Sequence, residues 1–128
     1  MIMQRTALGR WGEAVARTYL ENNGYAVGEQ NYRTRYGEID LVAKKKDLLV
    51  FVEVRTKGGE MFGTPEDSLT RKKLLQLVKN AKAYVARKKY KGMCRIDAIC
   101  IVAGTQDEPE RISHYENITD GLKIFKVV

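Results

Sequence analysis

Acidic side chains interrupt two apolar, β-branched runs between residues 37 and 57. The first run carries Glu38 and Asp40, and the second carries Glu53, Arg55 and Lys57 at alternate positions. Because successive side chains of a strand point to opposite faces, we expect each group to share one face of its strand. Carboxylate oxygens are the ligands that hard divalent cations such as Mg²⁺ take from proteins. The spacing therefore suggests a metal site built on two strands.

A short polar break at residues 46–47 separates the two runs, which predicts a β-hairpin. A turn centred there places Leu41 opposite Val52, an apolar pair. Continued by one step, the same register places Asp40 opposite Glu53. A slip by one residue would move the charged set onto the apolar face, so the pattern specifies this register.

The predicted pairing of Asp40 with Glu53 needs an explanation, because like charges directly opposite on a sheet are destabilising. A shared proton, a nearby cation or a bound metal would relieve the repulsion. The alternative is a solvated strand face on which Arg55 and Lys57 neutralise the acids. Spacing alone leaves both interpretations open.

A helix is predicted over residues 8–23, closed by Gly24. Gly9 and Gly12 weaken helix propensity, which suggests that something packs or binds close to the backbone there. Glu13 lies between small or apolar helical neighbours and can lean toward the protein. The alternative is an ordinary surface pair with Arg17, worth a few tenths of a kcal/mol.

The strongest helical pattern covers residues 66–89, with apolar side chains repeating at helical spacing. Between Ser68 and Ile96 there are ten basic residues and no acidic one. A basic helix can be a simple solvated face, but this excess of positive charge favours contact with phosphates. The residues that we assign to nucleic-acid binding are Arg71, Lys72, Lys73, Lys79, Lys82 and Arg87.

Length and composition narrow the class of protein. The 128 residues predict a single domain over 1–128, with residues 119–128 as a strand or a tail. A net charge of +7 suggests a polyanionic partner, nucleic acid first. No apolar run is long enough to span a membrane, and we expect a cytoplasmic protein without a secretory signal. Cys94 and Cys100 are too far apart on one strand to pair, so reduced thiols are expected.

The remaining elements complete an α/β pattern. Strands are predicted over residues 25–35, 94–103 and 111–118, with 94–103 as a central strand. Arg95 and Asp97 either pair structurally or serve the site, and a structural role is predicted for His114. Residues 58–65 form a loop that is either a flap over the acidic strand or a plain connector.

The chain contains an ordered set of short motifs, namely Gly12-Glu13, Gly37-Glu38-Ile39-Asp40-Leu41-Val42-Ala43, Phe51-Val52-Glu53-Val54-Arg55, Lys72 and Arg95-Ile96-Asp97. Taken together, these motifs resemble the bacterial YraN-like family. That family is similar to the restriction-endonuclease-like PD-(D/E)XK superfamily and to Holliday-junction resolvases. The resemblance implies an α/β fold with a restriction-endonuclease-like core, in which helices flank a central mixed β-sheet.

The resemblance also assigns roles. Glu13, Asp40 and Glu53 would bind Mg²⁺ or Mn²⁺, and Asp40, Glu53, Arg55 and Lys57 would form the catalytic set. The expected function is endonucleolytic hydrolysis of nucleic acid, most readily DNA and with branched DNA as one substrate, by a protein that could act as a homodimer. Arg55 departs from the motif, which has Lys here, and Arg cannot act as a base. The alternatives are a nucleic-acid-binding module without catalysis and a structural or interaction protein.

Overall fold

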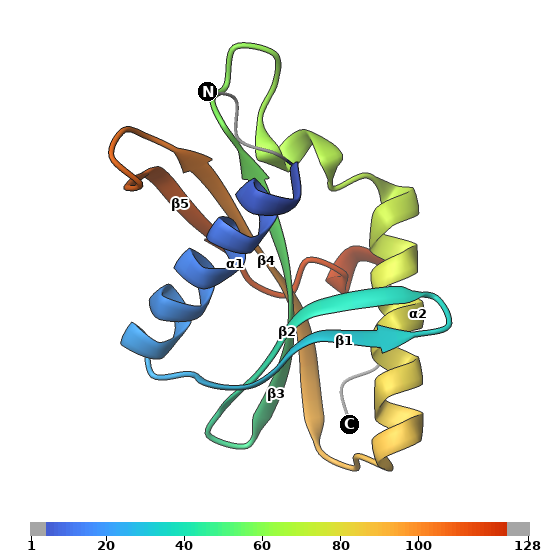
Figure 1. Cartoon of the computed structure of the whole chain (residues 1–128). Helices are drawn as coiled ribbons and strands as arrows, with labels where there is room; N and C mark the ends of the chain where they lie inside the picture. The colour runs from blue at the N-terminus through green and yellow to red at the C-terminus, as the bar shows by residue number, and fades with distance from the viewer. Residues whose placement is uncertain (1–4, 123–128) are drawn as a thin grey trace.

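A five-stranded mixed sheet lies between two long helices in the computed structural model, which describes residues 5–122 (Figure 1). In chain order the elements are α1 Arg5–Asn22, β1 Ala26–Thr34, β2 Gly37–Lys45, β3 Leu48–Lys57, the 3₁₀ turn η1 Pro65–Ser68, α2 Arg71–Lys88, β4 Met93–Ala103, β5 Pro109–Tyr115 and the 3₁₀ turn η2 Asp120–Leu122.

The sheet has the strand order β1-β2-β3-β4-β5. Neighbouring strands run antiparallel except β3 and β4, which run parallel and are connected through α2. A parallel pair requires such a crossover, and a helix usually supplies it. The predicted α/β class with a mixed sheet and flanking helices is confirmed. The prediction that strand 94–103 is a central strand is confirmed, because β4 pairs with β3 on one side and with β5 on the other.

Each helix covers its own apolar face of the sheet (Figure 1). The α1 face buries Ala16 and Leu20 against Val50 and Val52 of β3. The α2 face is made of the alternate residues of β3 and β4 with the apolar stripe of α2, including Leu49, Phe51, Cys94, Ile96, Leu77, Val78 and Ala81. This alternation is what makes β3 apolar at nearly every position until Glu53.

Helix α1 confirms the prediction for residues 8–23, although it begins at Arg5 and ends at Asn22. Gly24 ends it with a φ of +86°, a conformation that favours glycine. Gly12 has a packing reason: a Cβ there would lie 2.0 Å from Oγ1 of Thr56 on β3. A Cβ at Gly9 would have no such neighbour within 4 Å, so close packing does not explain this glycine.

The second predicted helix is not continuous from residue 66. Pro65–Ser68 forms a 3₁₀ turn, and α2 begins only at Arg71. Thr70 has an extended backbone and caps the helix, because its hydroxyl accepts a hydrogen bond from the Lys73 amide at 3.2 Å. Apolar residues continue on both sides of this break, so the periodicity of the sequence does not show it. The capping residue Thr70 marks where α2 begins.

The predicted register of the β2–β3 hairpin is confirmed over residues 41–45 and 48–52, where Leu41 pairs with Val52. The ladder does not continue to Asp40 and Glu53. Instead Oδ2 of Asp40 accepts a hydrogen bond from the Val54 amide at 2.8 Å. The Asp40 side chain thus takes the place of a backbone acceptor where β2 separates from β3. Beyond this point Ile39 packs on the α2 face of the sheet, although strict alternation from Leu41 would place it on the α1 face.

Smaller predictions have mixed outcomes. The last strand covers 109–115 and not 111–118. Both cysteines are free and buried, as expected, and burial raises the pKa of the Cys100 thiol to about 12. Within residues 5–122, neither helix is long and apolar enough to cross a membrane. The tail predicted for 119–128 lies outside the described residues from position 123 onward.

Candidate functional site

A cleft of about 360 Å³ opens where β2 separates from β3. Both helices reach it: the start of α1 contributes Leu8, Gly9 and Glu13, and the first turn of α2 contributes Lys73. The strands supply the remaining lining, namely Glu38, Asp40, Glu53, Val54, Arg55 and Thr56. Because the β2–β3 ladder ends here, side chains that paired strands would place opposite each other line a cavity instead. The acidic side chains among them form one side of the cleft, the acidic wall.

Asp40 is the most perturbed acid of the cleft. Burial, followed by repulsion from Glu53, raises the pKa of Asp40 from 3.8 to about 8. The Val54 hydrogen bond opposes this shift and Glu13 adds to it. Within the described chain Asp40 has no ion pair with a Lys, Arg or His. The carboxyl is thus held in place by one amide without a positive charge beside it.

Glu53 is more deeply buried, with a side chain only 4% exposed, and two cations reach its Oε2. Arg55 Nη1 lies 3.1 Å away and Lys73 Nζ lies 3.4 Å away. Arg55 also donates from Nε to Oγ of Ser68 at 2.7 Å, which connects β3 to η1. The predicted neutralisation of the acids by Arg55 is therefore present at Glu53, and the partner is Lys73 and not Lys57.

Glu13 faces the cleft, as its helical neighbours suggested. Nδ2 of Asn31 on β1 donates to Oε1 of Glu13 and to Oε1 of Glu38, each at 3.0 Å. The alternative pairing with Arg17 does not form, because Arg17 pairs with Glu21 at 3.3 Å. Glu13 and Glu38 are in this way linked through one amide at the rim.

The donor set suits a hard cation only in part. Asp40 and Glu53 interact directly and offer oxygen ligands alone, and Mg²⁺ often takes just one or two protein carboxylates. Over residues 5–122, however, no three His, Cys, Asp or Glu side chains form a group that could hold a metal ion. Asp40 and Glu53 are therefore the two carboxylates that a divalent ion could use here, while Glu13 is hydrogen-bonded to Asn31 at the rim.

The structure brings three of the four predicted catalytic residues into the cleft and leaves the fourth outside it. Asp40, Glu53 and Arg55 line one cleft with Glu13. Lys57 lies at the exposed end of β3, outside that lining. Sequence reasoning placed Lys73 among the nucleic-acid contacts, and the structure turns it toward Glu53. No signal along the strand could have revealed this, since the two residues meet only when α2 packs on the sheet.

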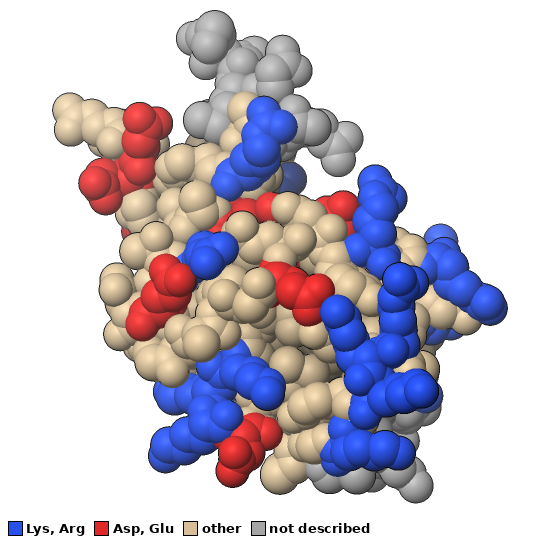
Figure 2. All heavy atoms as spheres, turned by 60° about the horizontal axis from the view of Figure 1, so that its bottom comes forward, with Lys and Arg blue, Asp and Glu red and all other residues tan. Residues whose placement is uncertain are grey.

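The other predicted nucleic-acid contacts lie on the exposed face of α2: Arg71, Lys72, Lys79, Lys82 and Arg87. Figure 2 shows Lys and Arg side chains gathered on the side of the molecule where α2 lies. At a rise of about 1.5 Å per residue, α2 carries this charge roughly 20 Å away from the cleft. These exposed basic side chains of α2 form a row, the cationic track, that begins next to the acidic wall of the cleft.

Comparison with known proteins places the chain in a family. Residues 12–101 match the model of the uncharacterised protein family UPF0102. The chain belongs to this family. The matched segment contains Glu13, Asp40, Glu53, Arg55 and Lys73, so it spans every residue of the cleft except Leu8 and Gly9.

The chain is similar to UPF0102 proteins from several bacteria. It is 43% identical over 95 residues to the one from Persephonella marina, covering 73% of this chain and 82% of the relative. It is 40% identical over 119 residues to the one from Moorella thermoacetica, covering 92% and 97%. Identity with the Pelotomaculum thermopropionicum protein is 40% over 114 residues, covering 88% and 95%. These similarities extend over nearly the whole relative in each of the last two cases.

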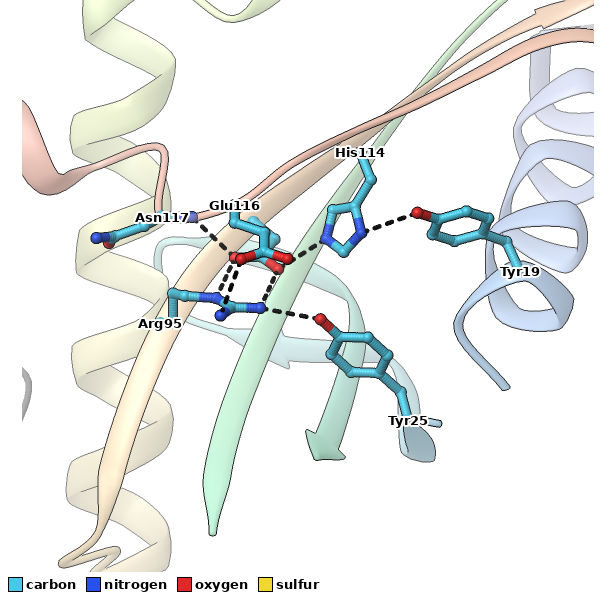
Figure 3. A network of polar contacts seen from close by, with 7 residues as sticks. Tyr19, Tyr25, Arg95, His114, Glu116 and Asn117 are labelled. Atoms are coloured by element: carbon cyan, nitrogen blue, oxygen red, sulfur yellow. Dashed lines mark hydrogen bonds and ion pairs between the residues drawn. The ribbon is translucent and has the colours of Figure 1, made fainter. Parts of the chain in front are cut away.

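A second buried acid, Asp97 on β4, does not line the cleft. It lies in a polar network of its own, whose other members are labelled in Figure 3. Arg95 donates to both of its oxygens, at 2.7 and 2.8 Å. His114 Nε2 lies 2.8 Å from Oδ2, and the Asn117 amide donates to Oδ1 at 3.0 Å. Burial alone would raise the pKa of Asp97, but these hydrogen bonds outweigh it and hold that pKa below its usual value.

The outer members of this network connect distant elements. Tyr19 of α1 lies 3.2 Å from Nδ1 of His114, and Arg95 donates to the hydroxyl of Tyr25 at 3.0 Å (Figure 3). The two alternatives for Arg95 and Asp97 are thereby decided in favour of structural pairing. His114 contacts both Tyr19 and Asp97, so the structural role predicted for it has its partners in this network.

The loop after β3 is anchored and not free. Arg111 on β5 binds Glu60 at 3.0 Å and Glu66 at 2.6 Å, so the loop is fastened at both ends. Its tip presents Met61 and Phe62, which are 86% and 93% exposed. It follows the cleft strand directly, but its residues do not line the cleft.

Proposed function

We propose that this protein binds nucleic acid and hydrolyses its phosphodiester bonds with the help of Mg²⁺ or Mn²⁺. The observation that supports this proposal most strongly is the environment of the Asp40 carboxyl in the cleft. A carboxyl that is pushed to a pKa of about 8 beside a second buried carboxyl, with no cation of its own among the described residues, costs stability. Groups perturbed in this way in a cleft are candidates for a functional site.

The family resemblance supports the same proposal. The YraN-like motifs assign metal binding to Asp40 and Glu53, and the two residues meet in the cleft. A mixed sheet between helices is compatible with a restriction-endonuclease-like core of the PD-(D/E)XK type. The family model itself names no activity.

The roles of the chain's own residues follow from their positions. Asp40 and Glu53 would hold the ion, and Glu13 would add negative charge from the rim. When bound, the divalent ion would supply the acidity that activates water and would neutralise charge on the scissile phosphate. The exposed basic side chains of α2 would hold the nucleic-acid backbone without reading sequence.

A nucleic-acid-binding module without catalysis is the second candidate, and one observation favours it. Arg55 stands where the motif has Lys, and both Ser68 and Glu53 engage its guanidinium. A guanidinium donates hydrogen bonds but cannot act as a base. The two candidates share the basic face of α2 and differ only in what the cleft does.

The deciding experiment is cleavage of labelled single-stranded, duplex and four-way-junction DNA with Mg²⁺ or Mn²⁺. The variants are Asp40→Asn and Glu53→Gln, and Asp47→Asn in the exposed β2–β3 turn is the matched control. We expect metal-dependent cutting that is lost in both cleft variants and kept in the control. DNA binding with no cutting under any condition would leave the binding module as the answer.

Binding has its own test. Replacing Lys79, Lys82 and Arg87 by Gln should weaken DNA binding and reduce the slope of log affinity against log salt by about 2–3, because each phosphate that a side chain neutralises contributes close to one unit. A slope that does not change would remove α2 from the interface.

A further inference from the structure

Lys73 differs from the other basic side chains of α2. Arg71, Lys72, Lys79 and Lys82 are exposed, whereas the Lys73 side chain is only 26% exposed and lines the acidic cleft. Its ammonium lies 3.4 Å from Oε2 of Glu53. Lys73 is thus the point where the cationic track of α2 enters the cleft.

Local structure fixes where this lysine points. Thr70 caps α2 through the Lys73 amide at 3.2 Å, and the helix starts there because the 3₁₀ turn before it ends at Ser68. Leu74, Leu77 and Val78 then pack toward the sheet and set the rotation of the helix. Lys73, next to Leu74 in the first turn, is carried to the edge of that packed face and above Glu53.

Arg55 is bound in a different way. Its Nε donates to Ser68 and its Nη1 to Glu53, and Ser68 in turn donates to the Pro65 carbonyl at 2.8 Å. The guanidinium therefore bridges β3 and η1 through short contacts on two sides. Lys73 has one longer contact, on a flexible stem with three donor hydrogens. Of the two cations, Lys73 has the freedom to turn from Glu53 to a bound substrate.

We infer that Lys73, supplied by α2, is the catalytic cation of the cleft, and that Arg55 is a positioning residue that holds Glu53 and η1 in place. This rests on the proposed hydrolase function. The Lys73 ammonium donates a hydrogen bond to a non-bridging oxygen of the scissile phosphate.

The reaction it assists is simple hydrolysis. The oxygen of a water molecule forms a bond to phosphorus, and the bond between phosphorus and the leaving ester oxygen breaks. One proton of the water ends on the leaving oxygen, which departs as an alcohol, and the other product is a phosphate monoester. Negative charge builds up on the phosphoryl oxygens during this step, and a donor aimed at it is worth about 10²–10³ in rate.

Single-turnover cleavage of labelled DNA with saturating protein and Mn²⁺ tests the assignment. We expect Lys73→Met to slow cleavage about 100-fold or more, and Lys73→Arg to recover part of the rate because it restores the charge. Lys46→Met, in the exposed β2–β3 turn, is the matched control and should keep the wild-type rate. Affinity for DNA should change less than about threefold in Lys73→Met, since the other basic side chains of α2 still hold the backbone.

Arg55 is tested in parallel through a different readout. Arg55→Lys should keep most of the cleavage rate if its role is positioning, and Arg55→Met should lower thermal stability together with the rate. Cleavage by Lys73→Met within threefold of wild type, with Arg55→Met inactive but fully folded, would overturn the assignment and return the catalytic role to the strand.

Calorimetric titration with Mn²⁺ alone gives a readout that does not depend on turnover. Lys73→Met should bind Mn²⁺ at least as tightly as wild type, because it removes a cation from Oε2 of Glu53. A large loss of Mn²⁺ affinity would make Lys73 part of the site's scaffold and would contradict the inference. If wild-type protein binds Mn²⁺ but cuts no substrate, the proposed function fails, and this inference fails with it. Cutting that survives Lys73→Met defeats the inference alone.

Discussion

Asp97 and Asp40 are both aspartates on interior strands, and their surroundings are opposite. Asp97 is fully buried and receives two hydrogen bonds from Arg95, one from the Asn117 amide and a close contact from His114. Asp40 receives one amide hydrogen bond and faces Glu53. The pKa of Asp97 is held below its usual value, and that of Asp40 rises to about 8.

The difference separates a carboxylate that serves the fold from one that is available to a ligand. A buried charge is tolerated when partners satisfy it, and removing one partner is costly. A carboxylate left unsatisfied in a cleft lowers stability, and binding of a cation recovers it. Replacing each of the two aspartates by asparagine is therefore expected to change the stability of the fold in opposite directions.

Asp97→Asn has the largest expected effect. The amide keeps the shape but loses the charge that balances Arg95, so the free energy of unfolding in urea should fall by about 3–5 kcal/mol. Glu116→Gln is the control, because Glu116 is 60% exposed and contacts Arg95 from outside at 3.3 Å. Its effect should stay below about 0.5 kcal/mol. Equal effects of the two substitutions would remove the distinction between the inner and the outer acid.

Asp40→Asn should act in the opposite direction. Without metal, at pH 8, it removes a carboxylate that repels Glu53 while the Val54 amide keeps an oxygen acceptor. We expect a gain of about 1–3 kcal/mol, seen as a rise in melting temperature of several degrees. Asp47→Asn should leave the melting temperature nearly unchanged. Added Mn²⁺ should then stabilise the wild type and not Asp40→Asn, which reverses their order.

The pH dependence sharpens the comparison. The folded pKa of Asp40, about 8, exceeds its ordinary value of 3.8, so the folded protein binds a proton that the unfolded chain has lost. This contribution to stability is complete below about pH 4 and is lost as the pH rises toward 8. The stability difference between Asp40→Asn and wild type should grow over that window in metal-free buffer. A difference that stays constant with pH would mean that Asp40 is ionised throughout.

Tyr25→Phe has the smallest expected effect. The Tyr25 hydroxyl accepts one hydrogen bond from Arg95, whose other contacts to Asp97 remain. The loss should be about 0.5–1.5 kcal/mol in urea denaturation, the usual worth of one hydrogen bond. Tyr36→Phe, on the exposed β1–β2 turn, should change stability by less. A loss as large as that of Asp97→Asn would show that the network acts as a single unit.

Periodicity and charge determined a large part of this protein. The alternation around Asp40 and Glu53 predicted the hairpin and its register up to Leu41, because a slip would expose the whole apolar face. The absence of acids after Ser68 predicted the basic face of α2. These features follow from local rules, in which a residue's neighbours along the chain decide its conformation.

Only the tertiary structure decided how the charges are shared. The strand pattern offered Arg55 and Lys57 as partners for Glu53, and the fold replaced Lys57 by Lys73 from α2. It also ended the β2–β3 ladder just before Asp40, which turned an expected cross-strand pair into a cleft. The physical reason is that burial and Coulomb interactions depend on distance in space. Packing of α2 and α1 on the sheet sets those distances, and no spacing along the chain records them.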